Sequence, residues 1–485
     1  MKSNRNLSRG EARRLGNVAL IALMLVALLL LSLVRARFSP IDKTGAAIKA
    51  EEHEAMAMGK ETETLAAADQ AATSAAGASA EAEGGGETHP KPAAGASSKP
   101  VCYESSRRSD TCEAAGDVRV AGLAQTVYAS PLEREWKVKP YCRKQDAFAL
   151  SHVKEWSLRP LPGPHCTVNS SATAFVLSTG GFTGNLFHDY TDVLIPAFIT
   201  ARRYAAAGEV QFLVSSFKPW WTSRYLPIFQ QLSRHEVVDA DADAEVRCYP
   251  RVVVGPTFHR ELGVDDDAAA SNTSMAEFRA MLRGAFGLER ATATPSGDRW
   301  DIRRRPRLLV LSRARSRRFV NERAMVDMAM SLGFDVRVGD PEASSDAGKF
   351  ARLVNSADVM VGVHGAGLTN MVFLPAGAVL VQVVPFGGLE WLARGAFREP
   401  AAGMGLHYLE YAVQLDETTL SEAYARDDPV LRDPASVHRR GWDALKAVYL
   451  DQQNVRPHLG RLKNTFMEAL RMLPHGRLAS EDEPS

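Results

Sequence analysis

Cysteine is scarce in this chain, and its spacing argues against one common kind of site. Only five cysteines occur in 485 residues, and no two of them form the Cys-x-x-Cys pair that is typical of structural zinc sites. That number suits one or two disulfides and one remaining thiol in an oxidising compartment, and the pairing stays open. The five are Cys102, Cys112, Cys142, Cys166 and Cys248.

An excess of charge of one sign is also absent. Lys and Arg total 58 while Asp and Glu total 57, which gives a formal net charge of +1. A chain with this balance gives no indication that nucleic acid is its main partner. Its length allows two domains with substantial cores.

Aromatic residues are absent from Gly45 to Pro100, a segment dominated by Ala, Glu, Gly, Ser and Thr. Such a composition buries too little apolar surface to offset the entropy lost on ordering, so residues 35–100 are predicted to form a flexible stem. The folded body is predicted to begin near Val101.

The chain has one long hydrophobic run, Leu15 to Val34, which contains 20 residues without a charge. As a helix it spans about 30 Å, the thickness of the hydrocarbon core of a bilayer. Residues 1–14 contain five basic residues and one acidic residue, which places them in the cytosol and the rest of the chain across the membrane. The run is longer than the core of a cleaved signal peptide and no cleavage site follows it, so a signal anchor is predicted.

Two segments match the acceptor sequence for N-glycosylation. They begin at Asn169 and Asn272. On the lumenal side of a membrane both asparagines would be available for modification.

The second half of the chain alternates strand-like and helix-like segments. Strands are predicted by the apolar runs "RLLVLS", "DVRVG", "DVMVGV" and "AVLVQVVP", and helices by the intervening "NERAMVDMAMSLGF", "DAGKFARLVNSA" and "LTNMVFL". This alternation indicates a parallel sheet covered by helices on both faces. The first half mixes shorter runs, such as "AFVLS" and "QFLVSSF", with a helix after His188. Residues 101–300 and 301–485 are therefore predicted to form two domains.

A histidine between glycines follows the strand "DVMVGV". In an open parallel sheet, ligands bind where the carboxyl ends of strands lead into helices. The segment His364-Gly365-Ala366-Gly367 occupies such a place, and its bare backbone and the helix that follows suit an anion such as phosphate. A tight turn capped by a histidine is the alternative, because Gly-x-Gly without a third glycine is not the full dinucleotide fingerprint.

Arginines follow the first predicted strand of the same half. Arg313 and Arg317 lie just after "RLLVLS", which places them at the same carboxyl edge as His364. Guanidinium groups there suit bidentate capture of a diphosphate, whereas a solvated basic face is the alternative. After the last predicted strand, Glu390 can accept hydrogen bonds from sugar hydroxyls or pair with Arg394 four residues later.

In the first half, the segment "GNLFHDYTD" is a candidate for acid–base chemistry. His188 and Asp192 are four residues apart and share a helical face, where a carboxylate can orient and charge an imidazole. Asp189 is the competing base. The alternative is that Asn185 or Asp189 only caps the helix and that His188 is a structural residue.

Together these segments resemble glycosyltransferase family 61, the plant xylan arabinosyl- and xylosyltransferase family. The resemblance runs from about Val101 to the C-terminus and is carried, with the anchor, by "GGFTGNLFHDYTDVLIPAF", "VDADADAEVRCYPRVVVG", "LSRARSRRF" and "VGVHGAGLTNMVFLPAGAVLVQVVPFGGLEWLAR". It implies a Golgi type II membrane protein of the α/β class, in which two Rossmann-like domains face a cleft, the GT-B architecture. The nucleotide sugar would bind mainly to the C-terminal domain and the acceptor to the N-terminal one.

The resemblance also implies roles for individual residues. Asn185 would lie on the acceptor side, near the candidate catalytic residues His188, Asp189 and Asp192. The nucleotide-sugar site would consist of Arg313, Arg317, His364, Gly365, Gly367, Thr369, Asn370 and Glu390.

The acidic run from Asp239 to Asp243 contains Asp-x-Asp, which holds a metal and a sugar diphosphate in the other common glycosyltransferase architecture. Here the run is far in sequence from the arginines, which favours a solvated acidic turn, and no metal ligand is predicted.

The sequence thus predicts an inverting glycosyltransferase that moves a pentose, arabinofuranose or xylose, from a UDP-sugar onto xylan. Such a transfer needs a base for the acceptor hydroxyl and positive charge for the departing diphosphate. No cofactor besides the donor substrate is predicted. Two alternatives stay open: an acyltransferase of the His-x-x-x-Asp type, because "HDYTD" also fits that pattern, and a non-catalytic sugar-binding relative.

Overall fold

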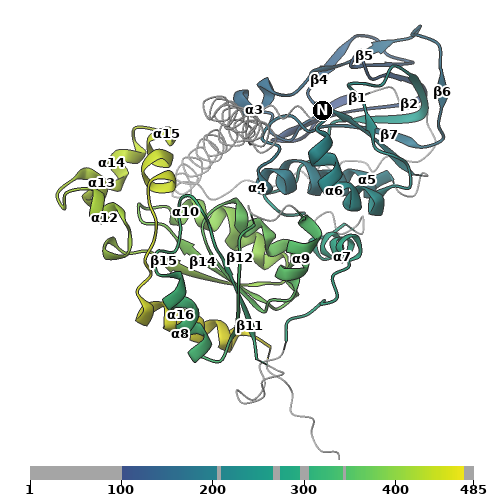
Figure 1. The fold of residues 1–485 in the computed structure, drawn as a ribbon. Coiled ribbons are helices and arrows are strands. Elements are labelled where there is room, and N and C mark those ends of the chain that lie inside the picture. The colour runs from purple at the N-terminus through teal and green to yellow at the C-terminus, as the bar shows by residue number, and fades with distance from the viewer. Residues whose placement is uncertain (1–100, 205–208, 266–272, 295–304, 342–345, 475–485) are drawn as a thin grey trace, which may run out of the picture. The chain divides into compact units, whose positions relative to one another are not determined.

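The computed structural model describes residues 101–204, 209–265, 273–294, 305–341 and 346–474. The described strands form two sheets, one between residues 101 and 254 and the other between residues 307 and 412 (Figure 1). The predicted domain boundary between residues 300 and 301 falls between these sheets and lies outside the described residues.

The first sheet has ten strands and is mixed. Strands β10, β7, β8 and β9 run parallel, whereas the long strand β2 pairs antiparallel with β10 on one side and β3 on the other. The strands are β1 (Val101–Ser106), β2 (Ser109–Ala121), β3 (Thr126–Ala129), β4 (Trp136–Val138), β5 (Trp156–Pro160), β6 (Val168–Asn169), β7 (Thr173–Ser178), β8 (Val210–Ser215), β9 (Val238–Asp239) and β10 (Val246–Val254). Only the run β10, β7, β8 and β9 matches the predicted Rossmann-like pattern. The antiparallel extension was not predicted.

Two disulfides stabilise this mixed sheet. Cys102–Cys112 joins β1 to β2, and Cys166–Cys248 joins the segment before β6 to β10. Cys142 is buried with a free thiol. The prediction of disulfides with one remaining thiol is therefore confirmed.

Helices of the first half pack beside the parallel strands (Figure 1). The predicted helix after His188 begins as one α-turn, continues as a π-helix and then becomes α-helical. The helices are α3 (Ala147–Ser151), α4 (Leu186–His188), the π-helix η1 (Asp189–Leu194), α5 (Ile195–Tyr204), α6 (Pro219–Leu232) and α7 (Met275–Phe286).

The second sheet is entirely parallel, with strand order β12-β11-β13-β14-β15. Strands β13 and β14 are buried along their whole length, which explains their uninterrupted apolar sequences. The four predicted strands are confirmed, and β15 adds a fifth. The strands are β11 (Arg307–Leu311), β12 (Asp335–Gly339), β13 (Val359–Val363), β14 (Val379–Val384) and β15 (His407–Ala412).

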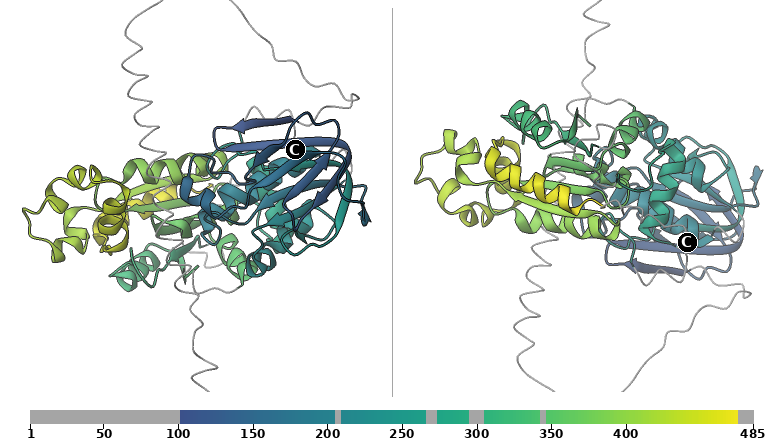
Figure 2. Two further views of the ribbon diagram at one scale, coloured as in Figure 1. Left: turned by 90° about the horizontal axis from the view of Figure 1, so that it is seen from above. Right: turned by 90° about the horizontal axis from the view of Figure 1, so that it is seen from below.

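Right-handed crossovers from β11 through α8 to β12, and from β12 through α9 to β13, place α8 and α9 on opposite faces of the sheet. The C-terminal helix α16 packs against α8, β14 and β15 (Figure 2). The predicted helix after His364 is the 3-10 helix η5. The helical elements are α8 (Glu322–Ser331), α9 (Ala347–Asn355), η5 (Ala366–Phe373), α10 (Glu390–Ala393), η6 (Arg394–Arg398), α11 (Glu399–Gly403), η7 (Leu415–Glu417), α12 (Leu420–Ala423), α13 (Pro429–Arg432), α14 (Pro434–His438), α15 (Trp442–Leu445), η8 (Lys446–Asp451) and α16 (Leu459–Met472).

One hydrophobic cluster continues from the first sheet into the second. The buried ring of Tyr190, on η1, contacts Phe278 on α7 and Phe373 on η5, with ring centroids 6.3 and 6.1 Å apart. Arg279 of α7, also buried, donates hydrogen bonds to the carbonyl oxygens of Leu374 and Met404. Helix α7 therefore packs against elements of both halves.

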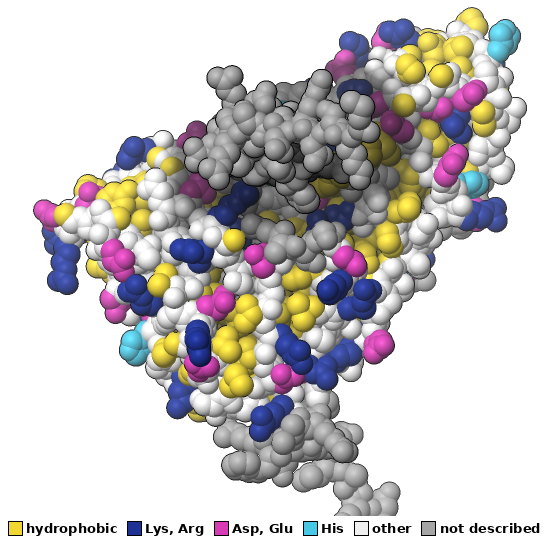
Figure 3. Space-filling view, viewed as in Figure 1, with side chains coloured by type: hydrophobic (Ala, Val, Ile, Leu, Met, Phe, Trp, Pro, Cys, Tyr) yellow, Lys and Arg dark blue, Asp and Glu magenta, His cyan; other side chains and the backbone are white. Residues whose placement is uncertain are grey.

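Several predictions concern residues that the structure does not describe. The anchor (15–34), the stem (35–100) and Asn272 all lie outside the described residues. Within the part of the chain that is described, every helix is too short or too polar to cross a membrane. Figure 3 shows basic and acidic side chains interspersed on one face of the molecule, as the balanced composition suggests.

Candidate active site

The strand order of the second sheet locates a crevice. From β11 the chain crosses to β12 at one edge, whereas from β13 it continues to β14 on the other side, so the connections diverge between β11 and β13. Ligands of doubly wound sheets bind at the carboxyl ends of the strands at such a switch point. Arg313 follows β11 and His364 follows β13, so both predicted elements lie at this crevice.

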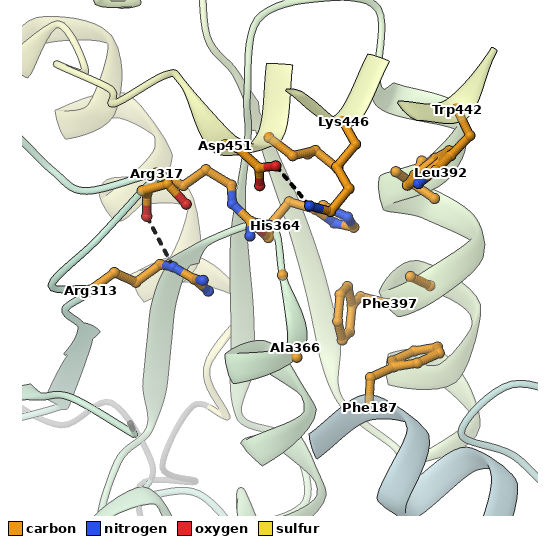
Figure 4. Close-up of a pocket in the computed structure, with 14 residues that line it drawn as sticks. Phe187, Arg313, Arg317, His364, Ala366, Leu392, Phe397, Trp442, Lys446 and Asp451 are labelled. Carbon is orange, nitrogen blue, oxygen red and sulfur yellow. Dashed lines mark hydrogen bonds and ion pairs between the residues drawn. The ribbon is translucent and has the colours of Figure 1, made fainter. Parts of the chain in front are cut away.

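Arg313, Arg317 and the His364 turn converge there, as predicted (Figure 4). Arg317 Nη1 donates to the carbonyl oxygen of His364 over 2.9 Å. A Cβ atom at Gly365 would lie 2.8 Å from Arg317 Nη1 and 2.9 Å from Arg313 Nη1, and the φ of Gly365 is 149°. The positive φ favours glycine at this position, and a side chain would push the two guanidinium groups away from the turn.

His364 is a neutral hydrogen-bonding group in this site. Its side chain is buried, and the amide Nε2 of Gln382 donates to its Nδ1 over 2.7 Å, while Gln382 Oε1 accepts from the Tyr408 hydroxyl over 2.9 Å. Burial lowers the pKa of His364 to about 3, and the charges of Arg317 and Arg313 act in the same direction. Because Nδ1 is an acceptor, the proton of the neutral ring is on Nε2.

The cavity at this turn measures about 70 Å³, below the roughly 300–1,000 Å³ of typical small-molecule pockets. It therefore suits a diphosphate, and a whole nucleotide sugar would extend beyond it. Its wall also contains residues that the sequence did not indicate. The additional lining residues are Phe187, Ser316, Ala366, Leu392, Ala396, Phe397, Trp442, Lys446, Leu450 and Asp451.

Lys446 and Asp451 form an ion pair of 2.7 Å at this wall. They are five residues apart, a spacing that brings side chains together in a π-helix, and they are the first and last residues of η8. Side chains on the same face of an α-helix are three or four residues apart, so the usual helical sequence pattern does not reveal this pair.

Four of the predicted nucleotide-sugar residues do not line this cavity: Gly367, Thr369, Asn370 and Glu390. Thr369 and Asn370 are buried in η5, and Asn370 Nδ2 donates to the carbonyl oxygen of Gly367 over 2.8 Å. Glu390 is the first residue of α10. The alternative pairing of Glu390 with Arg394 is not formed, because Arg394 makes two hydrogen bonds of 2.9 Å with Glu410.

The start of the helix in the first half forms a buried polar network. Asn185 caps it, because its Oδ1 accepts from the backbone N–H groups of Phe187 and His188 at 2.9 and 3.4 Å. His188 is fully buried, and its Nδ1 lies 2.8 Å from Asp192 Oδ2. Among the described residues, His188 Nε2 has no hydrogen-bond partner.

Asp192 is held by two further residues. Arg143 Nε donates to both of its carboxylate oxygens, at 3.1 and 3.0 Å, and the Tyr141 hydroxyl donates to Oδ2 over 2.9 Å. Burial alone would raise the pKa of Asp192, but the charges of Arg143 and His188 and their hydrogen bonds lower it to about 2. Asp192 is therefore an anion at neutral pH, although it lies within the core.

Asp189 points into a different environment. Its carboxylate accepts from the indole N–H of Trp221 over 2.7 Å, the hydroxyl of Tyr225 over 2.9 Å and the backbone N–H of Gly184 over 2.9 Å. Burial raises its pKa, against the lowering effect of these donors. With three donors bound, Asp189 anchors α6 to the start of α4.

The aspartates of the acidic run each serve local structure. Asp239 Oδ1 accepts from the backbone N–H of Asp241, Asp241 lies 3.1 Å from Lys154 Nζ, and Asp243 pairs with Arg247 at 2.6 Å. No cluster of three or more metal-ligating His, Cys, Asp or Glu side chains occurs within the described residues.

Comparison with known proteins places these features in a family. Residues 186–381, which include His188, Asp189, Asp192 and the His364 turn, match the family model Glycosyltransferase 61. The alpha-1,3-arabinosyltransferase XAT3 of Oryza sativa subsp. japonica is 43% identical over 379 residues, which cover 77% of this chain and 65% of that protein.

Two other relatives are matched over more of their length. The beta-1,2-xylosyltransferase XYXT1 of Oryza sativa subsp. japonica is 38% identical over 395 residues, 77% of this chain and 84% of its own. The xylan glycosyltransferase MUCI21 of Arabidopsis thaliana is 34% identical over 390 residues, 76% of this chain and 78% of its own. With such identity over most of both chains, this protein belongs to the glycosyltransferase 61 family.

Proposed function

We propose that this protein is an inverting glycosyltransferase that transfers a pentose, arabinofuranose or xylose, from a UDP-sugar to xylan. The observation that carries the proposal is the convergence of Arg313, Arg317 and the His364–Gly365 turn on one cavity at the switch point of the second sheet. The names of the relatives, which refer to arabinosyl, xylosyl and xylan glycosyl transfer, support the choice of pentose and acceptor.

The chemistry follows from the charges at this turn. In an inverting transfer the diphosphate leaves as the acceptor oxygen attacks, so negative charge develops on the leaving group. Arg313 and Arg317 hold fixed positive charges there, and the Nε2–H of His364 can donate a hydrogen bond without adding a proton that depends on pH. Trp442 and Phe397 supply apolar surface in the same wall.

The residues predicted to be catalytic in the first half act, in this proposal, as a buried support for the acceptor side. None of His188, Asp189 and Asp192 lines the cavity of the arginines. The guanidinium group of Arg143 contacts both His188 and Asp192, whereas Asp189 accepts hydrogen bonds from Trp221 and Tyr225.

The proposed setting is the Golgi lumen, with the two halves paired as in the GT-B architecture. Residues 15–34 would be a type II signal anchor and residues 35–100 a stem. Two disulfides suit an oxidising lumen, and Asn169 is exposed, as a glycosylated asparagine has to be. Because the aspartates of the acidic run serve local structure, the proposal includes no metal ligand.

The test is a transfer assay with the purified full-length chain, xylohexaose and separate UDP-sugars, including UDP-arabinofuranose and UDP-xylose. One UDP-pentose is expected to give a product whose mass increases by one pentose, and linkage analysis then defines the bond formed. A parallel reaction in excess chelator is expected to keep its rate. Binding of the UDP-sugars without any transfer would instead identify a sugar-binding relative, and a lack of binding would contradict the proposal.

A further inference from the structure

A second cavity, of about 360 Å³, adjoins the cavity of the arginines. The two share Phe187, Leu392 and Ala396 as wall residues, so they form consecutive parts of one cleft. Side chains from both halves of the chain line the second cavity. They include Arg108, Arg260 and Glu261 from the first half and Glu399 and Pro400 from the second.

Glu261 is held in this cavity by one oxygen only. Its Oε1 accepts from Arg108 Nη1 over 2.6 Å and lies 3.7 Å from Arg143 Nη2. Its Oε2 is buried and has no hydrogen-bond partner among the described residues. A buried carboxylate oxygen without a donor is costly, and its position in a cavity wall indicates that a ligand supplies the donor.

The other carboxylates of the cleft differ from Glu261. Asp451 lies at the phosphate end and is paired with Lys446. Glu399 is exposed on α11. Glu261, with 22% of its side chain exposed, combines a fixed oxygen with an unsatisfied one.

The buried network of the first half ends at this carboxylate. Arg143 is fully buried, bonds Asp192 at 3.0 Å, lies 3.2 Å from His188 Nδ1 and approaches Glu261 from the same guanidinium group. His188 and Asp192 do not line the second cavity. The network therefore helps to fix the position of Glu261 from behind the cavity wall.

We propose that the second cavity binds the acceptor saccharide and that Glu261 is the general base of the transfer, an inference that rests on the function proposed above. The acceptor hydroxyl gives its proton to Glu261 Oε2. Its oxygen forms the new bond to the anomeric carbon, and the bond from that carbon to the diphosphate breaks with its electron pair going to UDP. The negative charge on UDP is balanced by Arg313 and Arg317 at the other end of the cleft.

The test compares Glu261→Gln with Glu135→Gln, which removes an exposed carboxylate outside both cavities, in the full-length protein. For Glu261→Gln, kcat is expected to fall by about 10²–10⁴-fold. The affinity for the UDP-sugar and the melting temperature should stay close to those of the parent. For Glu135→Gln, kcat is expected to stay within about threefold of the parent. A kcat for Glu261→Gln within threefold of the parental value would overturn the inference.

A second pair of variants separates proton transfer from folding, because Arg108 and Arg143 lose a charge partner in Glu261→Gln. Glu261→Asp keeps the charge but withdraws the oxygen, and it should bind the UDP-sugar normally while losing at least about tenfold in kcat. Glu261→Ala should regain transfer when formate is added, whereas Glu261→Gln should not. Normal transfer by Glu261→Asp, or equal formate responses, would count against the base. Since the parental protein is assayed alongside, its own inactivity would refute the proposed function rather than this assignment.

Discussion

Two buried histidines, one in each half of the chain, have contrasting surroundings. His364 is 4% exposed and His188 is 0% exposed, and each has its Nδ1 in a hydrogen bond. Beside His364 the nearest charges are guanidinium groups, and they help lower its pKa to about 3. Beside His188 the carboxylate of Asp192 and the guanidinium of Arg143 neutralise one another.

The difference in neighbouring charges distinguishes the region of His364, a ligand-binding site, from the region of His188, a structural support. Positive charge directed into a cavity at the switch point favours an anionic ligand, so that region is completed by substrate. Around His188 the carboxylate of Asp192 is bound by Tyr141, Arg143 and His188 within the core, and none of these residues lines either cavity of the cleft, so that region contributes rigidity. The same residue type therefore has two roles, which the neighbouring charges decide.

The largest effect is expected from removing the charge beside His364. The double variant Arg313→Ala, Arg317→Ala should lower kcat/KM for the UDP-sugar by about 10³-fold or more, since loss of one transition-state donor alone costs about 10²–10³. Arg315→Ala, in the same segment but exposed and outside the cavity, is the matched control and should have parental kinetics. A parental kcat/KM in the double variant would show that the region of His364 is not a binding site that depends on its positive charge.

The second-largest effect is expected in the buried network that contains Arg143, His188 and Asp192. Asp192→Asn removes the carboxylate that pairs with the buried Arg143 at 3.0 Å, so the free energy of unfolding at pH 7 should fall by about 3–5 kcal/mol. Denaturant unfolding of parent and variant measures this difference. Glu135→Gln, which breaks the exposed pair with Arg159, is the control and should leave the unfolding midpoint unchanged.

The same variant, Asp192→Asn, also tests how the stability of the fold depends on pH. The pKa of Asp192 is about 2 in the folded protein and about 3.9 in an unfolded chain, so this carboxylate stabilises the fold above about pH 4. About 2 kcal/mol of that stabilisation should be lost as the pH falls from about 4 to 2. In Asp192→Asn this part of the acid dependence should be absent. An unchanged pH dependence in the variant would contradict the assignment.

The sequence was sufficient to predict the part of the site that is formed by residues directly following the strands. Arg313 and His364 each follow an apolar strand, and the carboxyl ends of neighbouring parallel strands meet at one edge, so their convergence could be predicted. Thr369 and Asn370 were predicted from the family resemblance, as residues at the start of the following helix. They are buried instead, because η5 is a tight 3-10 helix.

The rest of the site depends on tertiary packing that leaves little local signal. Lys446 and Asp451 reach the cavity from a segment more than 80 residues beyond His364 and are paired by a π-helix. Glu261 follows β10 in a loop without a motif, and its unsatisfied oxygen is visible only in three dimensions. Strand β2 was missed for a similar reason, since its partner β10 lies more than 120 residues away in the sequence.

The smallest expected effect sharpens the description of His364 as a neutral donor. In Tyr408→Phe, Gln382 loses the donor that fixes its amide orientation, so a flipped amide can present its oxygen to Nδ1 of His364. The ring proton would then move to Nδ1, and Nε2 would become an acceptor that no longer donates to a diphosphate. The dissociation constant of the UDP-sugar should rise by about two- to tenfold, as expected for one hydrogen bond of about 0.5–1.5 kcal/mol. The KM for the acceptor should stay constant, because Tyr408 does not line the second cavity. A parallel rise in both constants would point to a general loss of structure and not to the orientation of one imidazole.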